Sequence, residues 1–452
     1  MKRRDFLKAA GLLSVGSVLP MVPSLKLYAA HDNYAGPLWL TIDARGGWDP
    51  TSFCDPKGYA DANDPARLNN YPSANIEQVG NFSVAPPPDS FATNTTLFTT
   101  KDFFQNHFEK LLVVNGIDSQ TNSHSDGQRH NWSGELARQG FPNIGALVAG
   151  TLANNRALPF ITNGGYSAGG GLTTPVRIDS RGLNALFEIA YPNRSQNAGN
   201  SSSRTYFSDD VMQLVDQANA SRLDAVHDAQ QLIRIKSSIE KLRSARGASA
   251  HMTDLADNLE QVPEKTLAYF NGRDRAQSLY RQGRIALAAY ETGVTASAHI
   301  SAGGFDTHSN HDQNHYPRLM DFLQGIDGII QEAKDRGLDD RIVVVVGSDF
   351  GRTNKYNDGN GKDHWPVTSM MFMGNSQQVI TGNRVVGQST DAHKAVKIDP
   401  VSFAPDVDNT NSQSIRITPA YVHRALRKLA GVDNSSQATS FGLKGSDIDL
   451  FS

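Results

Sequence analysis

The 452-residue chain has a single cysteine, Cys54, so it cannot form an intramolecular disulfide. It also lacks an excess of charge of either sign, because 43 Lys and Arg stand against 46 Asp and Glu and basic runs are confined to the N-terminus. Without a basic surface to attract phosphates, nucleic acid is excluded as an expected partner. Hydrophobic residues make up 38% of the chain, enough for a well-packed core. The composition therefore predicts a globular protein that is stabilised by its core and by any metal it binds.

No long hydrophobic run occurs either, and the nearest to one is at the N-terminus. There, Arg3 and Arg4 precede Phe6 and an apolar stretch from Ala9 to Val22, which is followed by small residues up to Ala30. The stretch is too short and too rich in Gly and Ser for a stable membrane span. We interpret residues 1–30 as a cleaved twin-arginine signal. The expected partner is then the twin-arginine export machinery, the expected location is periplasmic or secreted, and no membrane span remains after cleavage.

Strand and helix patterns alternate along the rest of the chain. Strands are expected at 37–42, 110–115, 294–301, 341–347 and 368–373, and helices at 143–153, 208–246, 264–291, 316–336 and 418–431. The run of Ile and Val at 342–346 does not alternate with polar residues, which is typical of a central strand buried on both faces. This order predicts an α/β protein with a mostly parallel central sheet between helical layers. The helical segment at about 208–292 is expected to be a packing layer or an insertion within a single domain, 31–452.

Polar side chains gather in four loops, each directly after an expected strand. They supply, in chain order, Asp43 and Asp49, then Ser123 with His124, then Asp306 with His308 and His311, and finally Asp349 with Arg352 and His364. Because the carboxyl ends of parallel strands meet at one edge of a sheet, we expect these loops to lie together. Carboxylate and imidazole groups suit a divalent metal such as zinc, manganese, calcium or magnesium. The sequence therefore predicts a metal site at this edge.

Such a site could carry hydrolytic chemistry. Two metal ions about 4 Å apart can clamp a phosphoryl-type centre, and they need ligands from several loops. A serine hydroxyl such as that of Ser123 becomes a nucleophile when a cation stabilises its alkoxide. Arg352 or Arg45 could offer a bidentate fork to the bound oxyanion.

The loop motifs also resemble a known family. Asn122-Ser123-His124-Ser125-Asp126, Gly304-Phe305-Asp306-Thr307-His308 and Ser348-Asp349-Phe350-Gly351-Arg352 are similar to successive motifs of the bacterial domain-of-unknown-function 1501 family, and the similarity spans most of the mature chain. That family is regarded as a remote branch of the alkaline-phosphatase-like superfamily, which includes sulfatases and cofactor-independent phosphoglycerate mutases.

The resemblance implies a three-layer α/β/α sandwich and a role for each motif. Asp43 or Asp49 would be the first metal ligand and Ser123 the nucleophile. Asp306 with His308 or His311, together with His364, would bind one metal, and Asp349 would join the first Asp at the other. Phe350 stands where the superfamily has a second imidazole, so a one-metal site and a degenerate site both remain open.

Two classes of function follow. The first is an exported metal-dependent hydrolase of phosphate or sulfate esters, with transfer to an acceptor other than water as a variant. The alternative is a catalytically degenerate member that binds a polymer or a protein partner in the periplasm. His124 and His130 could instead be structural histidines, and His299, inside an expected strand, is expected to be a hydrogen-bonded core histidine.

Overall fold

The computed structural model describes residues 34–91, 98–178, 187, 190–191, 193–194, 205–247, 249–267 and 274–452. The expected export signal at 1–30 lies outside this part of the chain. Among the helices that are described, none combines the length and the hydropathy needed to cross a bilayer.

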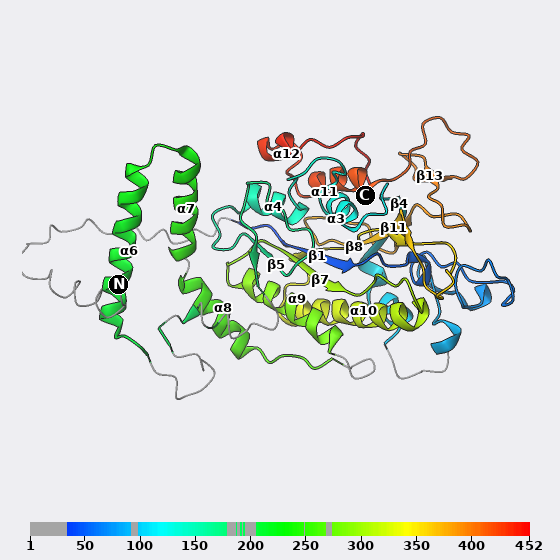
Figure 1. The fold of residues 1–452 in the computed structure, drawn as a ribbon, viewed down its shortest axis with the longest axis horizontal. Helices are drawn as coiled ribbons and strands as arrows, with labels where there is room; N and C mark the ends of the chain where they lie inside the picture. Colours follow the sequence, from blue (N-terminus) through cyan, green and yellow to red (C-terminus); the bar gives the residue numbers. More distant parts are fainter. Residues whose placement is uncertain are drawn as a thin grey trace, which may run out of the picture.

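A mostly parallel sheet forms the centre of the molecule (Figure 1). Its eight strands run in the order β12 (Arg384–Val386), β4 (Leu111–Asp118), β11 (Val367–Met373), β8 (Ile342–Ser348), β1 (Leu38–Arg45), β7 (Ser297–Gly303), β5 (Phe160–Thr162) and β6 (Val176–Arg177). Only β11 is reversed, because it pairs antiparallel with both β4 and β8 while the other neighbours pair in parallel. The predicted α/β class and mostly parallel sheet are confirmed.

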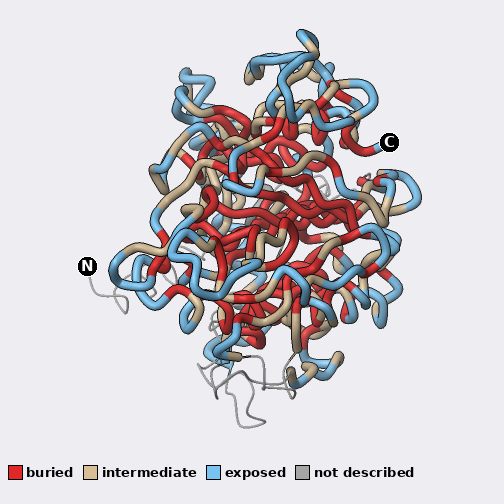
Figure 2. Tube along the Cα trace, turned by 90° about the vertical axis from the view of Figure 1, so that its right-hand side faces the viewer, coloured by how far each residue is buried: buried red, intermediate tan, exposed pale blue. Residues whose placement is uncertain are grey.

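Helices cover both faces of this sheet. One face carries α2 (Thr100–His107), α9 (Arg275–Glu291) and α10 (His311–Asp335), and the other carries α3 (His124–Ser133), α4 (Ile144–Leu152), α11 (Pro419–Leu429) and α12 (Ser436–Ser440) (Figure 1). The sheet has a hydrophobic core on each face. On β8, Val344 and Val346 pack into the core on the side of α9 and α10, and Val343 and Val345 pack into the core on the side of α3 and α11. Figure 2 shows these strands within the buried interior. The unalternating sequence of this strand therefore reflects burial on both faces.

The helical segment differs in detail from the prediction. The helix expected at 208–246 is two helices, α6 (Asp209–Ala229) and α7 (Ile233–Gly247), and they stand away from the sheet (Figure 1). The next helix, α8 (Ser249–Gln261), leads toward α9, which begins at Arg275 and not near residue 264. No residue of α6 is buried, so its apolar positions are not core within the described chain.

The predicted starts of α4 and α11 agree with the structure, and that of α10 does not. We expected α10 to begin at residue 316, but it begins at His311 and includes Pro317 in its second turn. The expected cap of α4 is confirmed, since the Asn143 side chain accepts a hydrogen bond from the Gly145 N–H. At α11, Thr418 occupies the cap position but its hydroxyl makes no capping hydrogen bond.

The remaining elements are short. They are η1 (Pro50–Ser52), η2 (Ser73–Asn75), β2 (Glu77–Val79), β3 (Phe82–Val84), η3 (Asp89–Phe91), η4 (Phe108–Lys110), β9 (Gly351–Arg352), β10 (His364–Trp365), β13 (Lys397–Ile398) and β14 (Pro405–Asp406).

Candidate functional site

The predicted loops meet at the carboxyl edge of the sheet. Asp43 on β1 lies level with Ser301 on β7 and with Gly347 on β8, so the loops that follow these three strands start side by side. Gly46 allows them to approach closely. Its φ is +118°, and a Cβ atom there would lie 2.5 Å from the backbone nitrogen of Asp306.

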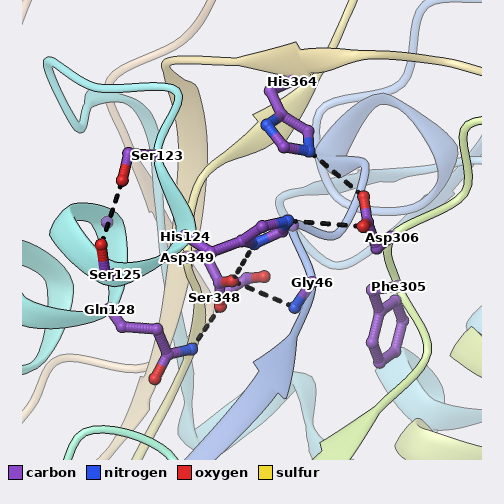
Figure 3. A network of polar contacts seen from close by, with 12 residues as sticks. Gly46, Ser123, His124, Ser125, Gln128, Phe305, Asp306, Ser348, Asp349 and His364 are labelled. Atoms are coloured by element: carbon purple, nitrogen blue, oxygen red, sulfur yellow. Dashed lines mark hydrogen bonds and ion pairs between the residues drawn. The ribbon is translucent and has the colours of Figure 1, made fainter.

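A solvent-accessible group of residues, which we call the open cluster, consists of His124, Asp306, His308 and His364. Within it, one ligand atom each of His124, Asp306 and His364 lie within 4.8 Å of one another. His124 Nε2 is 3.4 Å from Asp306 Oδ2, and His364 Nε2 is 3.2 Å from Asp306 Oδ1 (Figure 3). Two ligands of a four-coordinate zinc ion stand about 3.3 to 3.5 Å apart. The spacing of these donors fits one metal ion.

The orientation of the two imidazoles supports the same interpretation. His364 Nδ1 is 2.8 Å from the carbonyl oxygen of Asn122, and His124 Nδ1 is 2.6 Å from Asp349 Oδ2. Both partners are acceptors, so each Nδ1 donates a hydrogen bond, and a metal that replaces the proton on Nε2 would meet the Nε2 lone pair beside Asp306. Histidines that bind metals are usually fixed in this way by a carboxylate or carbonyl behind them.

His308 completes the open cluster. Its Nε2 is 3.0 Å from both Asp306 Oδ1 and His364 Nε2, and its Nδ1 is 2.7 Å from Asp363 Oδ1. It lies beside the three convergent donors and could serve as a fourth ligand.

Electrostatics keep Asp306 available as a ligand. Burial would raise the pKa of Asp306, but hydrogen bonding to Arg352, the Arg352 charge and the hydrogen bond from His364 outweigh it and lower the pKa to about 2. The hydrogen bond to Asp349 raises the pKa of His124. A carboxylate that is ionised at neutral pH is the form that binds a cation.

Two further carboxylates lie beneath the open cluster. Gln128 donates hydrogen bonds to both Asp43 and Asp349, which are 0% and 1% exposed. Burial, followed by the nearby charge of Asp349, raises the pKa of Asp43 well above its ordinary value. Asp43 Oδ1 has no hydrogen-bond partner in the described chain. The pair is placed to support the cluster through His124, and its predicted role as metal ligands stays a prediction.

His299 sits next to this pair and is only partly the core histidine that we expected. It is fully buried, and its Nδ1 lies 2.8 Å from the Thr41 hydroxyl. Its Nε2 is 4.0 Å from Asp43 Oδ2 and has no hydrogen-bond partner among the described residues.

The other two predicted ligands, Asp49 and His311, lie in a separate group that we call the closed cluster, made up of Asp49, His311, His315 and Lys362. Lys362 Nζ is 2.6 Å from Asp49 Oδ2, and His311 Nε2 is 3.3 Å from the same oxygen. His315 Nε2 accepts a hydrogen bond from the Asp49 backbone N–H. The structure therefore does not bring Asp49 and His311 to the open cluster, and the Lys362 ammonium group already neutralises Asp49.

The two arginines have different surroundings. The guanidinium of Arg352 is buried and donates to the carbonyls of Gly46, Gly47 and Lys362 and to Asp306, so its donors are already engaged. Arg45 is exposed, and its guanidinium has no hydrogen bond or ion pair to the part of the chain that the structure describes. Of the two arginines considered for an oxyanion, Arg45 is therefore the accessible one.

Ser123 precedes helix α3. Its hydroxyl lies 3.2 Å from that of Ser125, and it faces Ser125 and not Asp306 (Figure 3). Ser125 lines a cavity beside the cluster, and Ser123 is not among that cavity's lining residues.

Two cavities adjoin the open cluster. The smaller encloses about 350 Å³ and is bordered by Asp306, His308, Gln313 and Arg318, among others. The larger encloses about 700 Å³ and is bordered by Arg45, His124, Ser125, Gln128 and Tyr166, among others. Gly304 borders both.

Phe350, the departure from the expected motif, is fully buried. Its ring centre is 4.8 Å from that of His124 and 4.5 Å from that of His364, so it packs under both imidazoles. Sequence reasoning placed His124 in the second polar loop, with a structural role as an alternative, and did not include it among the predicted metal ligands, because nothing in the chain order shows that it meets Asp306.

Comparisons with known proteins were made on sequence and on structure. The model of a family described as "Protein of unknown function (DUF1501)" matches residues 39–418. No curated protein matches the sequence.

Similar solved structures include sulfatases, a phosphatase and a synthase. The lipoteichoic acid synthase LtaP from Listeria monocytogenes is 8% identical, with a TM-score of 0.38 over 96% of this chain and 79% of the other. The PsFucS1 sulfatase from Pseudoalteromonas sp. is 9% identical, with a TM-score of 0.37 over 91% and 73%. Alkaline phosphatase from the Antarctic bacterium TAB5 is 10% identical, with a TM-score of 0.30 over 75% and 91%. At these scores the likenesses carry no inference about chemistry.

Proposed function

We propose, from the geometry of its site, that this chain, which belongs to the DUF1501 family of proteins of unknown function, is a metal-dependent hydrolase of phosphate or sulfate esters. The observation that carries this proposal is the convergence of His124 Nε2 and His364 Nε2 on the carboxylate of Asp306. Both rings are fixed from behind by acceptors, as metal-binding histidines are.

Each residue then has a task. His124, Asp306 and His364 hold a divalent metal, zinc or manganese by their donor chemistry, with His308 as a candidate fourth ligand. The bound metal would polarise the ester oxygen and lower the pKa of a hydroxyl nucleophile. Arg45, exposed in the larger cavity, binds an oxygen of the anionic ester. The hydroxyl comes from the Ser123–Ser125 pair, of which Ser125 faces that cavity.

The location of the reaction is part of the proposal. The paired arginines at 3 and 4 and the apolar stretch after them support twin-arginine export of the folded protein to the periplasm or beyond. A protein exported in the folded state can carry a metal that it bound in the cytoplasm.

A second candidate function is binding without catalysis. Phe350 supports it, because a buried aromatic ring stands where the superfamily has an imidazole. In that case the open cluster would bind metal or a partner, and no ester would be turned over.

Metal content and ester turnover of one variant distinguish these functions. We expect the mature protein to bind about one zinc or manganese ion, and to hydrolyse 4-nitrophenyl phosphate or its diester or sulfate analogues. Asp306→Ala should lose both properties. Asp358→Ala, at an exposed aspartate in a nearby loop, is the control that should lose neither. A wild-type protein that binds metal without turnover would favour the binding function. One that neither binds metal nor turns over an ester would contradict the hydrolase proposal and leave binding of a partner as the remaining function.

A further inference from the structure

The open cluster lies at the junction of two cavities. Asp306 and His308 border the smaller one, His124 borders the larger one, and Gly304 borders both. An ester bound at His124 and Asp306 therefore has space on two sides.

This arrangement distinguishes between classes of ester. A phosphate or sulfate monoester carries one organic substituent, and a single cavity is enough to hold it. A phosphodiester carries two substituents on one phosphorus. The volumes of about 350 and 700 Å³ each lie within the range of small-molecule sites, so each can hold one substituent.

Charged side chains border both cavities. Arg352 is paired with Asp306, and Arg129 is paired with Asp126 at 2.6 Å. Arg45 borders the larger cavity, Arg275 and Arg318 border the smaller one, and Asp349 and Asp363 lie close to the cluster. Guanidinium groups therefore border both cavities, where they can bind an anionic phosphate group.

We propose that the substrate is a phosphodiester, with one alcohol group in each cavity. This inference rests on the proposed hydrolase function and specifies its substrate class. In the one-step route, an oxygen of water forms a bond to phosphorus, the bond from phosphorus to one alcohol oxygen breaks, and a proton of the water ends on that alcohol oxygen. In the two-step route, the serine oxygen first displaces the alcohol, which takes the serine proton. Water then displaces the serine oxygen, which takes a proton from that water, so both routes give an alcohol and a phosphate monoester.

Gln313 gives a direct test, because it is an exposed residue of α10 that borders the smaller cavity and does not belong to the open cluster. Gln313→Trp should fill that cavity, and Lys334→Trp, at an exposed position near the other end of the same helix, is the matched control. The substrates are bis(4-nitrophenyl) phosphate, 4-nitrophenyl phosphate and 4-nitrophenyl sulfate.

We expect the metal-loaded wild type to favour the diester in kcat/KM by about tenfold or more, the size of effect that one pocket gives. Gln313→Trp should remove most of that preference, because it should lower kcat/KM for the diester, which needs both cavities, more than for either monoester. Preference for either monoester would overturn the diester proposal and leave the hydrolase proposal intact. An equal effect of Gln313→Trp on all three substrates would also overturn it.

Binding to the metal-free protein provides a readout that does not need turnover. Bis(4-nitrophenyl) phosphate should bind to chelator-treated wild type and Lys334→Trp several-fold more tightly than to Gln313→Trp, as measured by calorimetry. If no substrate is hydrolysed, the hydrolase proposal fails. The titration still decides whether the smaller cavity holds one group of a phosphodiester. Equal binding to all three proteins would show that the smaller cavity holds no part of a diester.

Discussion

The open and closed clusters contain the same kinds of residue, and they differ in what supplies the positive charge. In the closed cluster, Asp49 and Lys362 are both 0% exposed, and the lysine ammonium group lies against the carboxylate. In the open cluster, the side chains of Asp306 and His308 are 45% and 47% exposed, and three donors converge without a lysine. Asp306 also has a cationic neighbour, Arg352, but that guanidinium contacts Oδ1, while Oδ2 faces His124. Asp306 therefore keeps a carboxylate oxygen that no lysine or arginine contacts, whereas the buried Lys362 ammonium group lies against Asp49.

The two clusters share one loop of the sequence. His308 and His311 are three residues apart, yet they belong to different clusters because α10 begins at His311, directly after Asn310 with its positive φ of 45°. The start of this helix therefore decides that His308 faces Asp306 of the open cluster and that His311 faces Asp49 of the closed cluster.

Asp49→Ala should have the largest effect on stability. It would leave the buried Lys362 charge without a partner, which costs about 3–5 kcal/mol in comparable ion pairs. Chemical denaturation measures this loss, and metal affinity of the folded variant should stay within about twofold of wild type. The double variant Asp49→Ala, Lys362→Met should regain part of the stability. A large loss of metal affinity with normal stability would mean that the two clusters have been assigned the wrong roles.

His364→Ala should weaken metal binding and leave stability nearly unchanged, which is the reverse of the expectation for Asp49→Ala. Loss of one of three convergent ligands should weaken zinc affinity by about a hundredfold, or about 2.7 kcal/mol, with little change in unfolding. Competition with a chelator of known affinity measures the change. His311→Ala is the matched control from the closed cluster and should leave zinc affinity unchanged. Similar zinc affinities for both variants would erase the distinction between the clusters.

Asp349→Asn should have a smaller effect on metal binding. Asp349 orients His124 through a 2.6 Å contact and is not one of the three convergent donors. Removing such a supporting carboxylate typically lowers metal affinity by about tenfold to a hundredfold, and we expect the lower end because the amide oxygen can still accept from His124 Nδ1. If Asp349 is itself a ligand, the loss should equal or exceed that of His364→Ala.

The smallest expected effect is the loss of stability at acid pH, when Asp49 of the closed cluster becomes protonated. Burial would raise the pKa of Asp49, but the charge of Lys362 outweighs it and holds the pKa well below its ordinary value of about 3.9. The ion pair therefore contributes its full stability above pH of about 4 and loses it as the pH falls further toward the folded-state pKa. Denaturation midpoints measured from pH 6 to pH 3 should fall less steeply in the Asp49→Ala, Lys362→Met double variant than in wild type. Parallel curves would show that Asp49 has no depressed pKa.

The shared edge of the sheet could be predicted from the sequence, and the membership of each cluster could not. The buried run 342–346 and the polar loops after β1, β7 and β8 were enough to place Asp43, Asp306 and Asp349 together. The role of His124 depends on a contact with Asp306 across 182 positions of chain, and that of Lys362 on a partner 313 positions away. Spacing in the sequence carries no information about such contacts.

Crystals grown with zinc and measured at the zinc absorption edge would test the central claim most directly. The account predicts one strong anomalous peak within about 2.0–2.2 Å of His124 Nε2, His364 Nε2 and a carboxylate oxygen of Asp306. It predicts no peak at Asp49, where Lys362 lies. A peak between Asp49 and His311, or no bound zinc at the open cluster, would contradict it.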